Sequence, residues 1–130
     1  GVYVANQTIK CMNKKGLIVK DAKILILGIT FKENCPDIRN TKIVDIYHTL
    51  TEYIHNITIY DPWADKEHVK QEYGIDIVNK LPEEVKYDAC ILAVAHNEFL
   101  KLNVRSLLKQ DGVVYDVKGI LPRDIIDSRL

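Results

Sequence analysis

Hydrophobic residues follow two kinds of spacing along the chain, and the two alternate. Continuous or nearly continuous apolar runs predict β-strands at 22–29, 56–62, 75–78, 87–95 and 112–117. Apolar residues three and four positions apart predict helices at 1–15, 41–55, 64–74 and 98–109, with a shorter one at 81–85. The tail, 118–130, is less regular, and we expect one helical turn in it at most.

Strands that alternate with helices predict an α/β fold. The runs at 22–29 and 87–95 are apolar on both faces, as parallel strands covered by helices on two sides usually are. With right-handed crossovers, we expect a Rossmann-like doubly wound five-stranded parallel sheet of order 3-2-1-4-5, with a preceding N-terminal helix. The order reverses between 22–29 and 87–95, and ligands of such sheets bind beside that point, at the carboxyl ends of the strands.

The first predicted helix has an apolar stripe made of Val2, Ala5, Ile9 and Met12, and no capping residue precedes it. A helix that begins in this way is typical of a piece cut from a longer protein, and the alternative is a native chain whose initiator methionine was removed. The stripe is therefore expected to pack against an absent domain or a second copy of the chain. We place a domain boundary after it, with residues 1–16 as a helical segment and 17–130 as one domain.

Composition removes several classes of function. The 130 residues suffice for one domain with a core of its own, and 18 basic residues balance 18 acidic ones. Zero net charge argues against nucleic acid or an anionic membrane as partner, because both attract proteins with excess positive charge. No apolar run approaches the roughly 18 residues of a membrane span. Three scattered cysteines without a CxxC pair predict neither disulfides nor a metal site, and favour a reducing cytoplasm.

Basic residues follow the predicted strands on what should be one edge of the sheet. Lys32 comes soon after 22–29, Arg39 lies seven residues further on, and Lys118 directly follows 112–117. Such a gathering of cations predicts an anionic ligand, most simply a phosphate or diphosphate. The alternative is that these are ordinary solvated surface charges.

A dinucleotide cradle is not predicted, since Gly28 stands alone where G-x-G-x-x-G would need three glycines, and no P-loop motif occurs. Simple structural roles remain open for the other polar residues near the strand ends. Asp61 can make a turn, Trp63 can pack on a neighbour, and His96 can cap the following helix or bind a ligand. Cys35 is more typical of an incidental cysteine than of a nucleophile.

Four segments together resemble one known family: GITFKENCPDIRNTK (28–42), YDPWAD (60–65), ILAVAHNEF (91–99) and VVYDVKGIL (113–121). They are similar to the C-terminal, UDP-binding domain of the UDP-glucose/GDP-mannose dehydrogenase family. The first of them is most similar to the branch that oxidises UDP-N-acetylhexosamines for capsule or O-antigen polysaccharides, including the Vi type. Residues 1–15 resemble the end of the central helix that joins the two halves of these enzymes and forms their dimer interface.

The resemblance implies a part of a cytoplasmic, homodimeric NAD-dependent enzyme that oxidises the C6 alcohol of a UDP-sugar to a carboxylate with two NAD+. Phe31 and Lys32 match the family's pair that contacts the nucleotide sugar, and Arg39 matches an arginine that reaches NAD bound by the other domain. Lys118 stands where many members have a substrate-contacting arginine, so the charge is kept and the planar fork is lost. The resemblance places the catalytic cysteine and the main NAD site in absent domains, so this part alone should be inactive.

Two other classes of protein stay open at this point. A flavodoxin-like receiver would explain a lysine after the fifth strand, but receivers need paired acidic residues after the first strand, and Thr30-Phe31-Lys32 supply none. A dimerisation module without a catalytic role would explain the striped first helix. Phosphorylation of Asp61 by acetyl phosphate would favour the receiver, and a UDP titration separates the dehydrogenase hypothesis from a dimerisation module.

Overall fold

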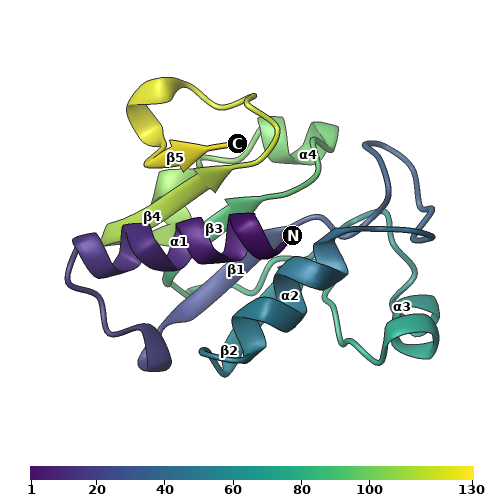
Figure 1. Cartoon of the computed structure of the whole chain (residues 1–130). Helices are drawn as coiled ribbons and strands as arrows, with labels where there is room; N and C mark the ends of the chain where they lie inside the picture. The colour runs from purple at the N-terminus through teal and green to yellow at the C-terminus, as the bar shows by residue number, and fades with distance from the viewer.

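The computed structural model describes all residues, 1–130, and contains one parallel sheet with helices on both faces (Figure 1). All five strands run parallel, in the order β2-β1-β3-β4-β5. Their bounds are β1 Lys23–Leu27, β2 Asn56–Tyr60, β3 Tyr87–Leu92, β4 Leu108–Asp116 and β5 Ser128–Arg129. The predicted fold class, a Rossmann-like doubly wound sheet after an N-terminal helix, is confirmed.

Successive side chains of β1 point to opposite faces and so build two hydrophobic cores. Ile24 and Ile26 join the larger core, under α1 and α2, whereas Leu25 and Leu27 join the smaller one, under α4. All four are fully buried, which explains why the run shows no polar alternation. The helices are α1 Val2–Lys14, α2 Ile43–Thr51, α3 Lys66–Tyr73 and α4 Asn97–Leu100, with 3-10 turns at Val19–Asp21, Val104–Leu107 and Arg123–Ile125.

The edges of the sheet differ from the prediction. The segment 75–78 lies beside β2 as expected, but a single parallel bridge between Tyr60 and Val78 replaces a full strand. At the opposite edge, β5 pairs with β4 and adds a strand that the sequence pattern did not predict. The short helix expected at 81–85 is absent.

The predicted helix 98–109 is wrong over its second half. Only α4 and the 3-10 turn Val104–Leu107 are helical, and β4 already begins at Leu108. Leu108 pairs with Tyr87 of β3 and packs into the smaller core, so pairing with a distant strand overrides the local helical spacing.

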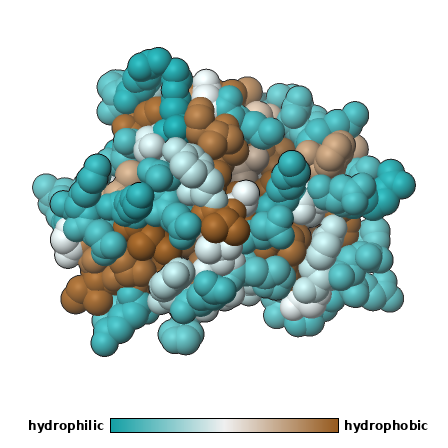
Figure 2. Space-filling view, in the orientation of Figure 1, coloured by the Kyte–Doolittle hydropathy of each residue, from teal (hydrophilic) through white to brown (hydrophobic).

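The N-terminal helix packs mainly on its own chain. Ala5 and Met12 are fully buried in the larger core, where α1 contacts α2 and β4. The expectation that the whole stripe packs against an absent domain or a second copy is therefore wrong for these two residues. Val2 and Tyr3 remain more than half exposed. Figure 2, in the orientation of Figure 1, shows hydrophobic patches among hydrophilic residues on the side of the molecule that carries α1.

Gly28 brings the ends of the two central strands into close contact. Its φ of +101° is a conformation that other residues rarely adopt, and a Cβ added there would lie 2.5 Å from Cβ of Val94. The loops that follow β1 and β3 are thereby held side by side at the point where strand order reverses. No helix combines the length and the hydrophobicity that crossing a lipid bilayer requires.

Candidate functional site at the carboxyl edge of the sheet

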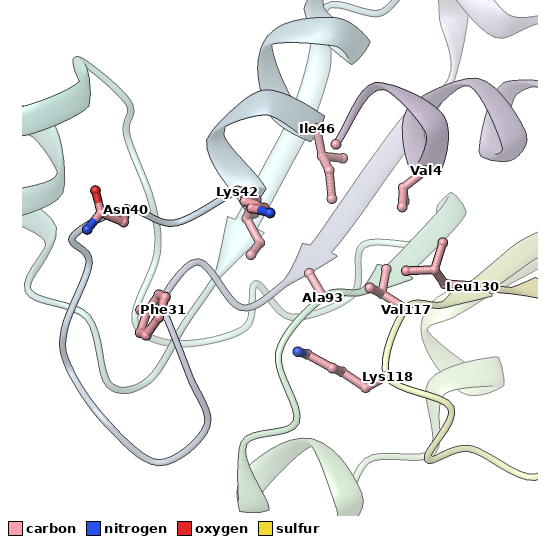
Figure 3. Close-up of a pocket in the computed structure, with 11 residues that line it drawn as sticks. Val4, Phe31, Asn40, Lys42, Ile46, Ala93, Val117, Lys118 and Leu130 are labelled. Carbon is pink, nitrogen blue, oxygen red and sulfur yellow. The ribbon is translucent and has the colours of Figure 1, made fainter.

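A pocket of about 240 Å³ opens where the loops after β1, β3 and β4 meet the first turns of α1 and α2. This is the edge at which doubly wound sheets bind their ligands. Most of its wall is apolar, and its polar residues come from the loops after β1 and β4 and from the start of α2 (Figure 3). Its lining residues are Gly1, Val4, Phe31, Asn40, Lys42, Ile43, Ile46, Ala93, Val117, Lys118 and Leu130.

Two of the predicted site residues, Phe31 and Lys118, line this pocket together. Figure 3 shows the Lys118 side chain extending from the loop after β4 towards the side of the pocket that carries Phe31. The Phe31 side chain is about half exposed, so part of its ring is available to a ligand. The pairing agrees with the rule that residues following different parallel strands meet at one edge.

A second charged side chain of the pocket, that of Lys42, was missed from the sequence. Lys42 directly precedes α2, and the apolar spacing of that helix indicates only which residues are buried. Neither Lys42 nor Lys118 takes part in any of the chain's ion pairs. The pocket therefore presents two uncompensated ammonium groups, which is the charge that an anionic ligand requires.

The other two predicted residues, Lys32 and Arg39, do not line the pocket. The guanidinium of Arg39 makes a bidentate contact with Asp37, at 3.0 and 2.9 Å, while its side chain stays 81% exposed. Hydrogen bonds from Arg39 lower the Asp37 pKa to about 2, and the nearby charge of Lys32 adds to the effect. Lys32 itself is exposed. The structure does not bring it beside Lys118 in the pocket.

Asp61, at the end of β2, anchors the loop that carries Phe31. Its side chain is fully buried and accepts hydrogen bonds from the backbone N–H groups of Ile29, Thr30, Trp63 and Ala64, at 2.8 to 3.2 Å. Burial alone would raise its pKa, but hydrogen bonds from His96 and the backbone outweigh burial and lower the Asp61 pKa. The turn expected at Asp61 exists, yet it is one part of a buried carboxylate site that the sequence did not reveal.

His96 is equally buried and connects Asp61 to the same loop. Its Nε2 lies 3.0 Å from Asp61 Oδ2 and 3.1 Å from Thr30 Oγ1, and its Nδ1 accepts the backbone N–H of Asn34 at 2.9 Å. The side chain makes no capping hydrogen bond to α4. His96 nevertheless holds the N-cap position of α4, where its carbonyl accepts the backbone N–H of Phe99 at 3.0 Å, so the predicted cap exists through the backbone alone. Direct contact with a ligand would need an exposure that this fully buried ring lacks.

Asp116 does for Lys118 what Asp61 does for Phe31. It is buried at the end of β4 and accepts the backbone N–H groups of Lys118, Gly119 and Leu121, at 2.7 to 3.0 Å. These contacts close the turn from which the Lys118 side chain extends. Both loops are thus tied to a buried carboxylate at a strand end: Asp116 ends the strand that precedes its loop, and Asp61 ends β2, the neighbour of the strand that precedes loop 28–42.

The chain lacks a cradle for a dinucleotide. The segment between β1 and α2 is a long loop, 28–42, and not the tight glycine-rich turn that presents a helix N-terminus to a pyrophosphate. The space next to Gly28 is filled by Val94. The residues of this loop therefore do not fit the cradle that a Rossmann domain offers to a dinucleotide. No cluster of three His, Cys, Asp or Glu residues with metal-binding geometry occurs.

A doubly wound parallel sheet with a cationic pocket at its switch point defines a domain of the nucleotide-binding α/β class. The chain belongs to the UDP-glucose/GDP-mannose dehydrogenase family, whose UDP-binding domain model matches residues 25–123. The resemblance found in the sequence is thereby confirmed. Family membership, and the lack of acidic residues directly after β1, argue against the receiver-like alternative.

Known relatives include UDP-N-acetyl-D-glucosamine 6-dehydrogenases of Pseudomonas aeruginosa and Salmonella typhi, each 47% identical over 133 residues. These alignments cover 100% of this chain and 31% of each relative, so the chain spans about a third of their length. Among solved structures, an NDP-N-acetyl-D-galactosaminuronic acid dehydrogenase from Methanosarcina mazei Go1 matches with a TM-score of 0.80 at 20% identity, over 94% of this chain and 26% of that one. That likeness shows the fold alone.

Proposed function

We propose that this chain binds the uridine diphosphate part of a UDP-sugar in the pocket formed by Phe31, Lys42 and Lys118. It would do so as the UDP-binding domain of an NAD-dependent UDP-sugar 6-dehydrogenase. The observation that carries the proposal is the pair of uncompensated lysines at the carboxyl edge of the sheet, in a chain of this family. The 47% identity to two UDP-N-acetyl-D-glucosamine 6-dehydrogenases favours a UDP-N-acetylhexosamine over UDP-glucose as the substrate.

The chemistry of the pocket suits a nucleoside diphosphate. Ammonium groups bind phosphate oxygens through short charge-assisted hydrogen bonds, and an aromatic ring packs on a planar base or a ribose. The volume of about 240 Å³ is below the ~300–1,000 Å³ of pockets that enclose a whole ligand. Only a part of the nucleotide sugar fits inside, and the rest lies against parts of the enzyme beyond this chain.

We assign the exposed residues of loop 28–42 to the completion of that site. Lys32 would add a third cation to the nucleotide sugar, and Arg39 would reach NAD bound by another domain of the same protein. Residues 1–16 would end the helix that links the domains, and 17–130 would form the UDP-binding domain. The exposed Val2 and Tyr3 would then pack against the rest of the enzyme or its homodimer partner.

The chain's role in the reaction is to bind and orient the substrate. Oxidation of a C6 alcohol to a carboxylate removes four electrons, which two NAD+ accept when the complete enzyme is loaded. The remote uridine diphosphate supplies binding energy that holds C6 in place for this chemistry, which takes place outside this chain. No residue here is proposed as catalytic, and the chain alone should produce no NADH with any UDP-sugar.

Calorimetric titration of the 130-residue chain with UDP tests the proposal. We expect binding, weakened about tenfold or more in Lys118→Ala, since a hydrogen bond to a charged group contributes roughly 1.5–3 kcal/mol. Lys20→Ala is the matched control, because Lys20 lies just before β1, at the opposite end of the strands from the pocket. No heat of binding, as a pure dimerisation module would give, or equal losses in both variants, would contradict the proposal.

A further inference from the structure

Asn34, in the middle of loop 28–42, is hydrogen-bonded to His96 and Asn97, which follow β3. Nδ1 of His96 accepts the backbone N–H of Asn34 at 2.9 Å, and Oδ1 of Asn34 accepts the backbone N–H of Asn97 at 2.9 Å. Asn34 has a φ of +55°, the left-handed conformation that asparagine tolerates better than most residues. These two hydrogen bonds hold the loop against the start of α4.

The hydrogen bonds also define which nitrogen of His96 carries the proton. A ring nitrogen that carries a hydrogen can only donate a hydrogen bond. Because Nδ1 accepts the backbone N–H of Asn34, Nδ1 is unprotonated and the proton lies on Nε2. Nε2 then donates to Oδ2 of Asp61, at 3.0 Å. The carboxylate therefore fixes the tautomer that makes Nδ1 an acceptor for the loop.

The ring is held on its remaining sides as well. Trp63 stacks on it with centroids 6.1 Å apart, and Phe99 meets it edge-on at 5.2 Å. His96 has no exposed surface, so it contacts the loop and not the ligand. A rigid, buried acceptor of this kind reduces the conformational freedom of the chain that it binds.

We infer that His96, oriented by Asp61, is a positioning residue that presents Phe31 and Lys32 to the bound nucleotide. The inference rests on the proposed function. His96 contacts the loop on both sides of Phe31 and Lys32. It contacts Thr30 just before these two residues and Asn34 shortly after them. Oγ1 of Thr30 also donates to the carbonyl of Lys32, which closes the turn between the two anchors.

Two conservative variants separate positioning from mere structural support. In His96→Asn, the side-chain oxygen takes the place of Nδ1 and can still accept from Asn34, while the contact with Asp61 is lost. In His96→Gln, the longer amide can still donate to Asp61, while the acceptor for Asn34 is lost. We expect UDP affinity about two- to tenfold weaker in His96→Gln, the range that one neutral hydrogen bond supplies, and a smaller loss in His96→Asn.

Hydrogen exchange of the Asn34 amide is the second measurement, and thermal melting the third. Exchange should accelerate in His96→Gln and stay slow in His96→Asn. Losses of affinity that merely follow the melting temperatures of the two variants would indicate structural support alone and overturn the inference. So would unchanged UDP affinity in His96→Gln alongside faster exchange, and that result would leave the proposed function intact.

A variant at the exposed end of the connection keeps the test valid if a His96 variant fails to fold. Asn34→Gly retains the positive φ and the N–H that His96 accepts, but it loses the link to Asn97 and gives the loop more backbone freedom, so UDP binding should weaken about two- to fivefold without a change in the core. Unchanged affinity there would show that UDP binding does not depend on how firmly loop 28–42 is held, which would count against positioning. A wild-type chain that does not bind UDP would overturn the proposed function and this inference together, whereas the outcomes above overturn the inference alone.

Discussion

Replacing Asp61 by asparagine should destabilise the domain far more than its small change in size suggests. Oδ2 receives the N–H groups of Ile29 and Thr30 and the ring N–H of His96, and Oδ1 receives those of Trp63 and Ala64. Both oxygens are thus acceptors for at least two donors. Whichever way the amide of Asp61→Asn turns, its NH₂ group faces donors that it cannot accept.

The expected loss can be worked out from those contacts. Two hydrogen bonds to a charged group at roughly 1.5–3 kcal/mol each give about 3–6 kcal/mol. Relief from burying a charge offsets part of this, so we expect unfolding to become easier by about 3 kcal/mol. A domain of this kind has about 5–15 kcal/mol to lose, and the variant should still fold.

Urea unfolding followed by the fluorescence of the single tryptophan, Trp63, measures this free energy. Asp76→Asn is the matched control, because Asp76 is 86% exposed and pairs only with exposed Lys70, a contact worth about 0–1 kcal/mol. The slope of the free energy against urea should be the same in both. A loss in Asp61→Asn within about 1 kcal/mol of the control would refute the argument from buried hydrogen bonds.

Three further outcomes are expected. The folded structure lowers the Asp61 pKa, so the stabilisation by Asp61 is present above the ordinary value of 3.8 and is lost as pH falls through the folded pKa. The free energies of unfolding of wild type and Asp61→Asn, measured in urea, should therefore converge at acid pH. A difference that stays constant with pH would contradict this. Gly28→Ala should cost well over the roughly 1 kcal/mol expected for Gly74→Ala in the same assay, since both have positive φ but only Gly28 meets a neighbouring side chain. Arg39→Ala should leave both stability and calorimetric UDP affinity of this chain unchanged, whereas weaker UDP binding would place Arg39 in the UDP site.

The central strands and β2 were predictable from the sequence, whereas the strand β5 at the opposite edge was not. The central strands are buried on both faces, so their burial appears directly as unbroken apolar runs. The short edge strand β5 depends on contacts with distant residues: Asp127 accepts the N–H of Val114 and pairs with Lys15 and Arg105. Such a connection leaves no pattern in the tail itself. The lost half of helix 98–109 has the same cause, since a partner 21 residues away decides the conformation of Leu108.

For the site, the sequence predicted residues at the carboxyl edge of the sheet but not the buried hydrogen bonds that hold their loops. Phe31 and Lys118 follow strand ends, and topology alone brings such residues together. Lys42 was missed because it follows a long loop and precedes a helix, so no strand end marks it. Asp61 and His96 looked like turn and cap residues, because hydrogen bonds between residues 35 apart cannot be seen in one sequence. The buried network became visible only when the chain was folded.

The two buried aspartates at the carboxyl edge of the sheet hold the loops that carry the pocket residues. Asp61 and Asp116 are fully buried, and both accept backbone N–H groups: Asp61 from the loops after β1 and β2, and Asp116 from the loop after β4. The two carboxylates therefore interact with backbone N–H groups rather than with the lysines, which leaves Lys42 and Lys118 outside any ion pair. Loss of Lys118 should consequently weaken binding without unfolding the domain, whereas loss of Asp116 should disturb both, because the loop that carries Lys118 loses its anchor.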